Sequence, residues 1–469
     1  MKKYVPNKYI CYLYFLVPLL INAIINYSSN EDIWYIMKYG KVILENGFIH
    51  TDILSMHSGL HIVIQQSFSN VLFYLIYKYM GSFGFFLLCE LMIGLYLFLI
   101  YKICMLLSNK KVLLSVLIAT ITCTLLEVNY ITPSPRIFTY LNLLLIIYIM
   151  EVFYKNNKSK LIYFLPLISL LQINFHGALW YFIFLFMLPY IAQLIIDKNK
   201  NVWKIICLVI VMFLVGFINP YTYENVFFPF LIYDSNINHY ISELYPMTLG
   251  GTNKPIITMS LLFYSVLCIQ LLIYIYCKKG KLELRHLFLL GGITLLALVN
   301  NRSFGVFLLG SLPILSNYLK NYNFKIKNNY VDTRKVWVGV CILILIVSIV
   351  NPKRLESSVK AGGDFLDKNY SKDIVLYTGC DYGSYLEYLG FHPYTDTRAE
   401  VYTKKGNKKQ EIFMEAINLE KYCYNYEEIL SKYKFTHLIV AKNSCLYYYL
   451  INAKEKVIFD EEEYAIFEL

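Results

Sequence analysis

A polar stretch follows the first long apolar run of the sequence, and it begins with the acids Glu31 and Asp32 and carries another at Asp52. A carboxylate can take a proton from a hydroxyl group, so each could serve as a general base. The apolar residues of this stretch recur at the spacing of one helix face, and they are Ile33, Ile36, Met37, Gly40, Ile43 and Leu44. We therefore predict a helix on the membrane surface that carries these acids. In the alternative interpretation Ser29 and Asp32 form a capping box, and Asp52 caps another helix.

Residues that could bind an anion lie at the ends of other apolar segments. Arg136 lies in TPSPRIF and Arg302 in VNNRSFG, and an arginine can hold a phosphate through two parallel hydrogen bonds. His176 and Asn174 lie in QINFHGALW, and Glu243 lies in a longer polar segment. Charged groups at membrane depth usually face a polar cavity, so we predict one cavity that they share. The alternatives are arginines that snorkel to lipid headgroups, a histidine held in a tight turn, and acids that pair between helices.

Membrane-spanning helices must position these residues. The chain is 57% hydrophobic and 16% charged, and apolar runs of spanning length recur through residues 1–350. Eleven spans are predicted, near residues 9–27, 83–105, 112–129, 137–154, 161–174, 177–196, 203–219, 256–277, 286–300, 303–319 and 335–350. The predicted fold class is a polytopic α-helical membrane protein, with a transmembrane domain at 1–350 and large outer loops at 28–82 and 220–255. No cleavable signal is expected, because the first apolar run lacks a small-residue cleavage site.

The distribution of charge predicts the orientation. Lysine and arginine concentrate in alternate segments, from the N-terminus to the segment that precedes the last span. Under the positive-inside rule these segments are cytoplasmic, as is the N-terminus. The acids, arginines and histidine named above then all face the outside. The net charge of +11 follows largely from the inner segments, so it gives no reason to expect a nucleic-acid partner.

Residues 351–469 are more charged and contain no predicted span, so we expect a small extracytoplasmic α/β domain. DIVLYTG predicts a buried strand, DYGSYLEYLG a helix that Gly390 closes, EEILSKYKFTHLIVA a helix and a strand, and KVIFDEEEYAIFEL a terminal hairpin. Its three cysteines are odd in number, so no disulfide framework is expected. Asp396, Arg398 and Glu400 lie close together in TDTRAE, either as an internal ion pair or as residues that contact an acceptor.

Several chemistries lack their motifs in this sequence. It has no H-E-x-x-H zinc motif, no phosphate-binding loop of the G-x-x-x-x-G-K-[ST] type and no G-x-S-x-G nucleophile elbow. Carboxylates and arginines remain, and together they suit transfer of a group from a phosphate leaving group to a hydroxyl. No nucleotide pool exists on the outer face, so the donor must arrive in the membrane. A sugar linked to a lipid phosphate fits this requirement.

Several stretches, in order along the chain, resemble the GT-C superfamily of integral-membrane glycosyltransferases, and bacterial proteins with an outer C-terminal domain in particular. They are EDIWYIMKYGKVILENGFIHTDILS, SPRIFTYLNLLLIIYIME, LPLISLLQINFHGAL, FINPYTYENVFFP, NNRSFGVFLLGSLP and YTGCDYGSYLEYLGFHPYTDTRAEVY. The resemblance implies a polyprenyl-phosphate sugar donor and transfer with inversion. It implies that Asp32 is the catalytic base or a ligand of a divalent cation. Glu31 is the less favoured candidate for the same role. Gln172 departs from the family pattern, in which an aromatic residue is expected at this position before the asparagine and the histidine.

The sequence therefore predicts a multi-pass cell-membrane glycosyltransferase that acts on the outer face in cell-envelope glycan or glycolipid assembly. The expected acceptor is a glycan, a lipid or a protein, and membrane lipids surround the enzyme. Two alternatives remain open. One is a polysaccharide polymerase or ligase, which also uses outer arginines and a lipid-linked donor. The other is a lipid-sugar flippase or an assembly scaffold with no enzymatic activity.

Overall fold

The computed structural model describes residues 10–24, 31–232, 283–320 and 355–469, with short pieces at 237, 240, 265, 267–269, 271–272, 338–344 and 346. The chain divides into two compact units. Unit 1 comprises residues 1–26, 82–219 and 238–353, and unit 2 comprises residues 27–81, 220–237 and 354–469. Glu243 and most of the predicted spans 256–277 and 335–350 lie outside the described residues.

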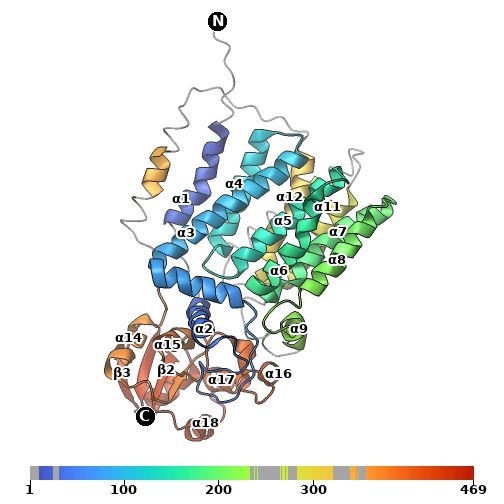
Figure 1. Cartoon of the computed structure of the whole chain (residues 1–469). Helices are drawn as coiled ribbons and strands as arrows, with labels where there is room; N and C mark the ends of the chain where they lie inside the picture. Colours follow the sequence, from blue (N-terminus) through green and yellow to red (C-terminus); the bar gives the residue numbers. More distant parts are fainter. Residues whose placement is uncertain are drawn as a thin grey trace. The chain divides into compact units, whose positions relative to one another are not determined.

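Unit 1 is built from apolar helices (Figure 1). They are η1 (Ile10–Phe15), α1 (Leu16–Ile24), the part of α3 (Ser67–Leu107) after Gly81, α4 (Val112–Tyr130), α5 (Arg136–Lys155), η2 (Lys160–Phe164), α6 (Leu165–His176), η3 (Gly177–Leu179), α7 (Tyr181–Ile196), α8 (Val202–Val215), α11 (Leu284–Val299), η6 (Asn301–Ser303) and α12 (Phe304–Leu319). In the described part of the chain they coincide with the predicted spans. Three stretches are long and apolar enough to cross a membrane: 67–107, 136–155 and 160–179.

Helix α12 lies in the core of unit 1. Residues 304–316 are all buried, as expected for a helix that is apolar on every side. Small residues allow its neighbours to approach closely. A Cβ on Gly305 would lie 2.5 Å from the hydroxyl oxygen of Tyr140 on α5, and one on Gly310 would lie 2.4 Å from Cδ1 of Ile293 on α11. These contacts hold α5 and α11 against α12.

A buried ion cluster links α5 to α11, and the sequence did not predict it. Glu151 accepts hydrogen bonds from the Nη2 and Nε atoms of Arg285, both at 3.2 Å, and lies 2.7 Å from Nε2 of His286. All three side chains are at most 4% exposed. The sequence placed Arg285 among the solvated basic residues of an inner segment. In the structure its charge is paired instead, as charged groups inside membrane helices usually are.

Unit 2 contains the first predicted outer loop as well as the C-terminal residues. Its helices are α2 (Asp32–Asn46), α3 up to Gly81, α9 (Tyr223–Ile232), α14 (Lys360–Asn369), α15 (Gly383–Leu389), η7 (Ala399–Tyr402), α16 (Lys404–Asn407), α17 (Phe413–Ile417), η8 (Asn418–Tyr422), α18 (Tyr426–Tyr433) and α19 (Cys445–Asn452). Its strands are β1 (Leu376–Thr378), β2 (His437–Ala441), β3 (Lys456–Asp460) and β4 (Tyr464–Glu468). The predicted α/β character of the C-terminal residues is thus confirmed.

The four strands form one sheet in the order β1-β2-β4-β3. β1 pairs with β2 in parallel, and β4 runs antiparallel to both β2 and β3. The predicted terminal hairpin is therefore correct. Gly390 ends α15 with φ of 99°, a left-handed conformation that glycine adopts without steric cost, as the sequence predicted.

Helix α2 confirms most of the predicted apolar face. Its buried residues include Ile33, Ile36, Met37, Gly40 and Ile43, whereas Leu44 is half exposed. A Cβ on Gly40 would lie 2.1 Å from a backbone oxygen of the helix segment that begins at Ser67, so only glycine permits this contact. The sequence did not predict that segment, which precedes the backbone break at Gly81.

Unit 2 holds a disulfide between Cys423 and Cys445, which corrects one prediction. The odd number of cysteines pointed away from a disulfide. The bridge joins η8 and the start of α18 to α19, while Cys380 remains free. The number of cysteines could not reveal this disulfide, because only the fold brings positions 423 and 445 together.

Candidate functional site

The polar residues of α2 lie on one face of the helix. Asp32, Tyr35 and Tyr39 follow one another at intervals of three and four residues, so their side chains point the same way. Asp32 is the first helical residue, and Glu31 is the N-cap without a side-chain cap bond. The helix begins later than the predicted capping box requires, and Ser29 lies outside the described residues.

This face meets the TDTRAE segment of the same unit. Burial raises the pKa of the Tyr35 hydroxyl well above its ordinary range, and the negative charges of Asp32 and Glu400 raise it further. Burial likewise raises the pKa of Glu400, and the charge of Asp32 adds to the effect. Asp32 and Glu400 are therefore electrostatic neighbours across Tyr35. The structure thus places a second carboxylate beside the predicted base, whereas the sequence had considered Glu400 only as part of an ion pair or as an acceptor contact.

Arg398 forms the centre of a buried ion cluster within unit 2. Its Nη1 donates to Oδ1 of Asp52 at 2.8 Å, and its Nη2 donates to Oε1 of Glu387 at 2.6 Å. Its Nε donates to both carboxylate oxygens of Asp396, at 2.9 and 3.0 Å. Arg398 is 2% exposed at its side chain and the three acids are fully buried. The interpretation of TDTRAE as an internal ion pair is correct, and the cluster extends to the predicted outer loop.

The three acids of the cluster share one guanidinium group, and the pKa values of Asp52 and Glu387 shift in opposite directions. Burial raises the pKa of Asp52, but the charge of Arg398 and the hydrogen bonds from Ser55 outweigh it, so the pKa falls to about 2. Burial raises the pKa of Glu387 well above its ordinary range, although Arg398 opposes the shift. Asp52 is therefore the ionised partner of the arginine, and Glu387 binds its proton more tightly than a free glutamate does.

The cluster also fixes the position of α2. The Tyr39 hydroxyl donates to Oδ1 of Asp52 at 2.8 Å and accepts from Nη1 of Arg398. Asp52 further accepts from the backbone amide and the hydroxyl of Ser55, at 3.1 and 2.6 Å, in a turn outside any helix. The prediction of Asp52 as a helix cap is therefore wrong. It is a buried anchor, and its partner Tyr39 lies two helical turns from Asp32.

Glu31 has contacts of its own. Its two carboxylate oxygens accept from the hydroxyl of Ser357 and the backbone amide of Ser358, both at 2.6 Å. Burial raises the pKa of Glu31, although these bonds oppose the shift. The contacts tie the start of α2 to the segment that leads into α14. Glu31 therefore holds the helix in place, which leaves Asp32 as the stronger candidate for a base.

A second polar grouping lies in unit 1 and contains three predicted residues. Arg136 is the first residue of α5, His176 is the last residue of α6, and Arg302 lies in the short helix η6. Both arginines lie near enough to His176 for their charges to act on its imidazole ring. The structure thus brings together three of the residues for which the sequence predicted a shared cavity.

Hydrogen bonds between α5 and α6 orient His176. Nε2 of Gln172 donates to Oγ1 of Thr139 and to the backbone oxygen of His176, both at 2.8 Å. Oγ1 of Thr139 lies 2.7 Å from Nδ1 of His176, and Asn142 donates to Oε1 of Gln172 at 2.9 Å. When Thr139 donates to Nδ1, the proton of the neutral ring lies on Nε2. The departure of Gln172 from the family pattern therefore supports the histidine.

The remaining predicted residues have structural contacts. Asn174 donates to the backbone oxygens of Leu170 and Ile218, both at 2.9 Å, and so ties α6 to the chain after α8. Glu90, an acid within an apolar run, accepts from Asn22 at 2.9 Å and so pairs α3 with α1, as the alternative interpretation expects of acids between helices. Glu243 lies outside the described residues.

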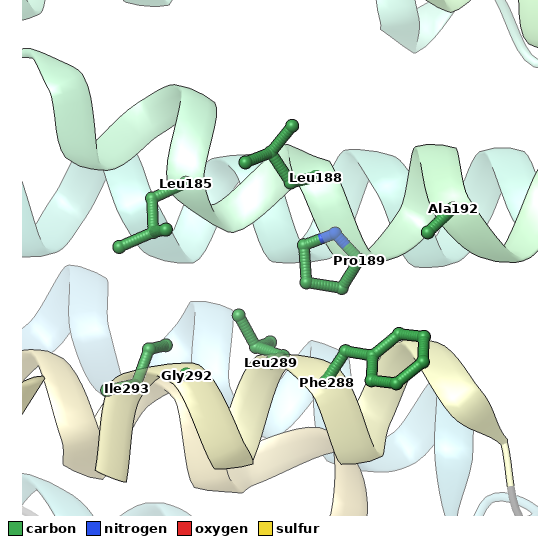
Figure 2. Close-up of a pocket in the computed structure, with 8 residues that line it drawn as sticks. All are labelled: Leu185, Leu188, Pro189, Ala192, Phe288, Leu289, Gly292 and Ile293. Carbon is green, nitrogen blue, oxygen red and sulfur yellow. The ribbon is translucent and has the colours of Figure 1, made fainter. Parts of the chain in front are cut away.

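An apolar pocket of about 220 Å³ lies between α7 and α11. Figure 2 shows its lining, which is Leu185, Leu188, Pro189 and Ala192 from α7 and Phe288, Leu289, Gly292 and Ile293 from α11. None of these side chains can transfer a proton or bind a phosphate. The pocket therefore has no part in the chemistry and suits contact with hydrocarbon.

The solved structures that this chain resembles include those of an archaeal enzyme. The oligosaccharyltransferase of Archaeoglobus fulgidus, tethered to an acceptor peptide with the NVT sequon, aligns with a TM-score of 0.64 at 11% identity. The alignment covers 94% of this chain and 70% of that one. The chain has the GT-C fold. The predicted resemblance is confirmed at the level of the fold.

Two further structures of the same oligosaccharyltransferase agree. The apo form aligns with a TM-score of 0.60 at 11% identity over the same shares of both chains. A complex with zinc and sulfate aligns at 0.56 with 10% identity, over 92% of this chain and 68% of that one. No family model and no curated protein matches the sequence.

A metal site like that of the zinc complex would need several ligating side chains close together. Within the described residues, no three histidine, cysteine, aspartate or glutamate side chains gather to hold an ion. Asp32 and Glu400 alone do not form such a set.

Proposed function

We propose that the protein is a GT-C glycosyltransferase of the cell membrane. It moves a sugar from a polyprenyl-phosphate-linked donor to an acceptor hydroxyl on the outer face, in the assembly of a cell-envelope glycan or glycolipid. The observation that carries this proposal is the position of Asp32 in a GT-C fold. Asp32 begins α2, lies beside Glu400, and is held there by the buried Arg398 cluster.

In this mechanism Asp32 is the general base. It takes the proton of the acceptor hydroxyl, whose oxygen forms a bond to the anomeric carbon of the donor sugar. The bond from that carbon to the phosphate oxygen breaks on the opposite side, so the configuration inverts. Burial and the charge of Asp32 raise the pKa of Glu400, so this carboxyl binds its proton more tightly than a free glutamate does.

The arginines of unit 1 serve the leaving group. Negative charge grows on the lipid phosphate as the glycosidic bond breaks, and groups aimed at that charge lower the barrier. The guanidinium groups of Arg136 and Arg302 are cationic and can each donate two parallel hydrogen bonds to a phosphate. Nε2 of His176 supplies a further hydrogen-bond donor. The Thr139 and Gln172 bonds keep the imidazole in one orientation, so little reorganisation is needed during the reaction.

Two observations support an outer location for unit 2. Its disulfide between Cys423 and Cys445 is of a kind that persists in oxidising compartments and is rare in the cytosol. Basic residues concentrate in the segments that the charge bias assigns to the inner side. On the outer side a lipid-linked sugar is an available donor, whereas a nucleotide sugar is not.

Glycan and glycolipid profiling of a strain that lacks the gene tests this function. We expect one glycan structure to be missing, and its lipid-linked sugar donor to accumulate in the outer leaflet. Expression of the wild-type gene should restore both. An unchanged glycan profile would contradict the proposal, and a donor that accumulates only in the inner leaflet would favour a flippase.

A further inference from the structure

Six tyrosines gather around the disulfide of unit 2. Three lie in KYCYNYEE, between η8 and α18, and three lie in CLYYYL at the start of α19. The bridge between Cys423 and Cys445 joins these two stretches. The stretches are far from TDTRAE in sequence and contribute no atom to the Arg398 cluster. We call this surface the tyrosine platform: Tyr422, Tyr424, Tyr426, Tyr447, Tyr448 and Tyr449.

Half of the platform is open to solvent. Tyr422, Tyr424 and Tyr448 are 61%, 63% and 61% exposed. The opposite face of α19 is buried through Leu446 and Leu450, so these tyrosines are not needed to complete the core. Exposed aromatic groups in such number usually mark a surface that binds another molecule.

The platform is held in one shape. The rings of Tyr426 and Tyr449 lie with their centroids 3.6 Å apart, which joins α18 directly to α19 beside the disulfide. Cys423 and Asn425 have φ of 48° and 54°, so the residues on both sides of Tyr424 adopt the left-handed conformation. This conformation is costly for a residue with a side chain and persists only where the surroundings enforce it. The exposed rings are therefore preorganised.

The chemical groups of the tyrosine side chains indicate which kind of ligand the platform would bind. A phenol ring presents an apolar face and a hydroxyl, which matches a sugar ring with its C–H face and its hydroxyl groups. Tyrosine also provides a large contact area at low conformational cost. Lys421 precedes the platform and Glu427 and Glu428 follow it, and all three are exposed, so charges of both signs border the tyrosines and favour no strongly charged ligand.

We propose that the tyrosine platform binds an uncharged saccharide chain through stacking of its sugar rings on the exposed tyrosines. The choice of a saccharide rests on the proposed glycosyltransferase function. The platform would hold the acceptor glycan or the growing product, at a site separate from the acids that act on the hydroxyl. Binding would then retain a chain between successive transfers.

The test is binding of uncharged hexasaccharides to the purified full-length protein in detergent. Maltohexaose, cellohexaose and mannohexaose serve as probes, with saturation-transfer NMR to detect contact and calorimetry to measure affinity. We expect at least one to bind, and Tyr424→Ala and Tyr448→Ala each to weaken it about tenfold. Tyr424→Phe should retain most of the affinity, because it keeps the ring.

Tyr223→Ala is the matched control, because Tyr223 is also 61% exposed and belongs to unit 2 but lies outside the platform. It should bind like the wild type. Asp32→Asn should also bind normally, so a failure of the catalytic proposal can be told from a failure of this one. The proposal is overturned if no hexasaccharide binds, if the platform variants bind as well as Tyr223→Ala, or if they instead change the oligomeric state.

Discussion

Replacement of Asp52 by asparagine tests whether the Arg398 cluster holds α2 in place. Asparagine keeps the shape of the side chain and can still accept the hydrogen bond from the backbone amide of Ser55. It removes the negative charge that faces Nη1 of Arg398 at 2.8 Å. The change in the stability of Asp52→Asn therefore reports the electrostatic part of the contact between Asp52 and Arg398 and not a change of packing.

The magnitude follows from the titration of Asp52. Its pKa falls from 3.8 to about 2 on folding. A shift of this size corresponds to about 2 kcal/mol of stabilisation when the carboxyl is ionised. Because the folded pKa is the lower one, the contribution is fully present above about pH 4 and is lost as the pH falls toward 2. Asp52→Asn should therefore cost about 2 kcal/mol at pH 7, and almost nothing near pH 2.

Pulse proteolysis in urea measures the unfolding of unit 2 in the detergent-solubilised protein. Glu45→Gln is the control, because Glu45 lies on α2 and forms an exposed ion pair with Lys41 that contributes little. The reasoning is refuted if Asp52→Asn is as stable as Glu45→Gln at pH 7, or if the gap between them stays constant as the pH is lowered.

Three further predictions follow from the same contacts. Glu387→Gln should cost more stability at pH 4 than at pH 8, because the pKa of Glu387 is raised, so its contribution is present below its unfolded value of 4.5 and is lost as the pH rises through the folded value; a cost in pulse proteolysis that grows as the pH rises would contradict this. Arg302→Lys should weaken donor use about 10- to 100-fold in a transfer assay, because lysine lacks the planar fork, and a wild-type rate would remove Arg302 from the mechanism. Gln172→Ala should lower kcat more than donor affinity, since it frees the imidazole of His176 to rotate, and a change in stability alone would indicate a packing role.

The sequence predicted most elements of the fold, because periodicity and turn residues are local signals. The surface helix at α2, the helix that Gly390 closes and the terminal hairpin all follow from such signals. The helix segment before Gly81 was missed, since its aromatic and polar residues match neither a span nor a regular amphipathic face.

The contacts between distant residues could not be predicted. Asp52 and Arg398 were each noticed, but they lie far apart in the chain and only the fold joins them. The same holds for Glu151 and Arg285, and for the disulfide of Cys423. Long-range pairing depends on the path of the backbone, which a single sequence does not encode in any local pattern.

The central claim is that Asp32 acts as the base in sugar transfer, and one rate comparison tests it most directly. Turnover of a polyprenyl-phosphate sugar, identified by the profiling above, is measured for the wild type, Asp32→Asn and Glu45→Gln. General-base catalysis contributes roughly 10²–10⁴-fold, so Asp32→Asn should lose that much in kcat while its unfolding in urea stays unchanged. Glu45→Gln should react at the wild-type rate. A turnover of Asp32→Asn equal to that of Glu45→Gln would contradict the account.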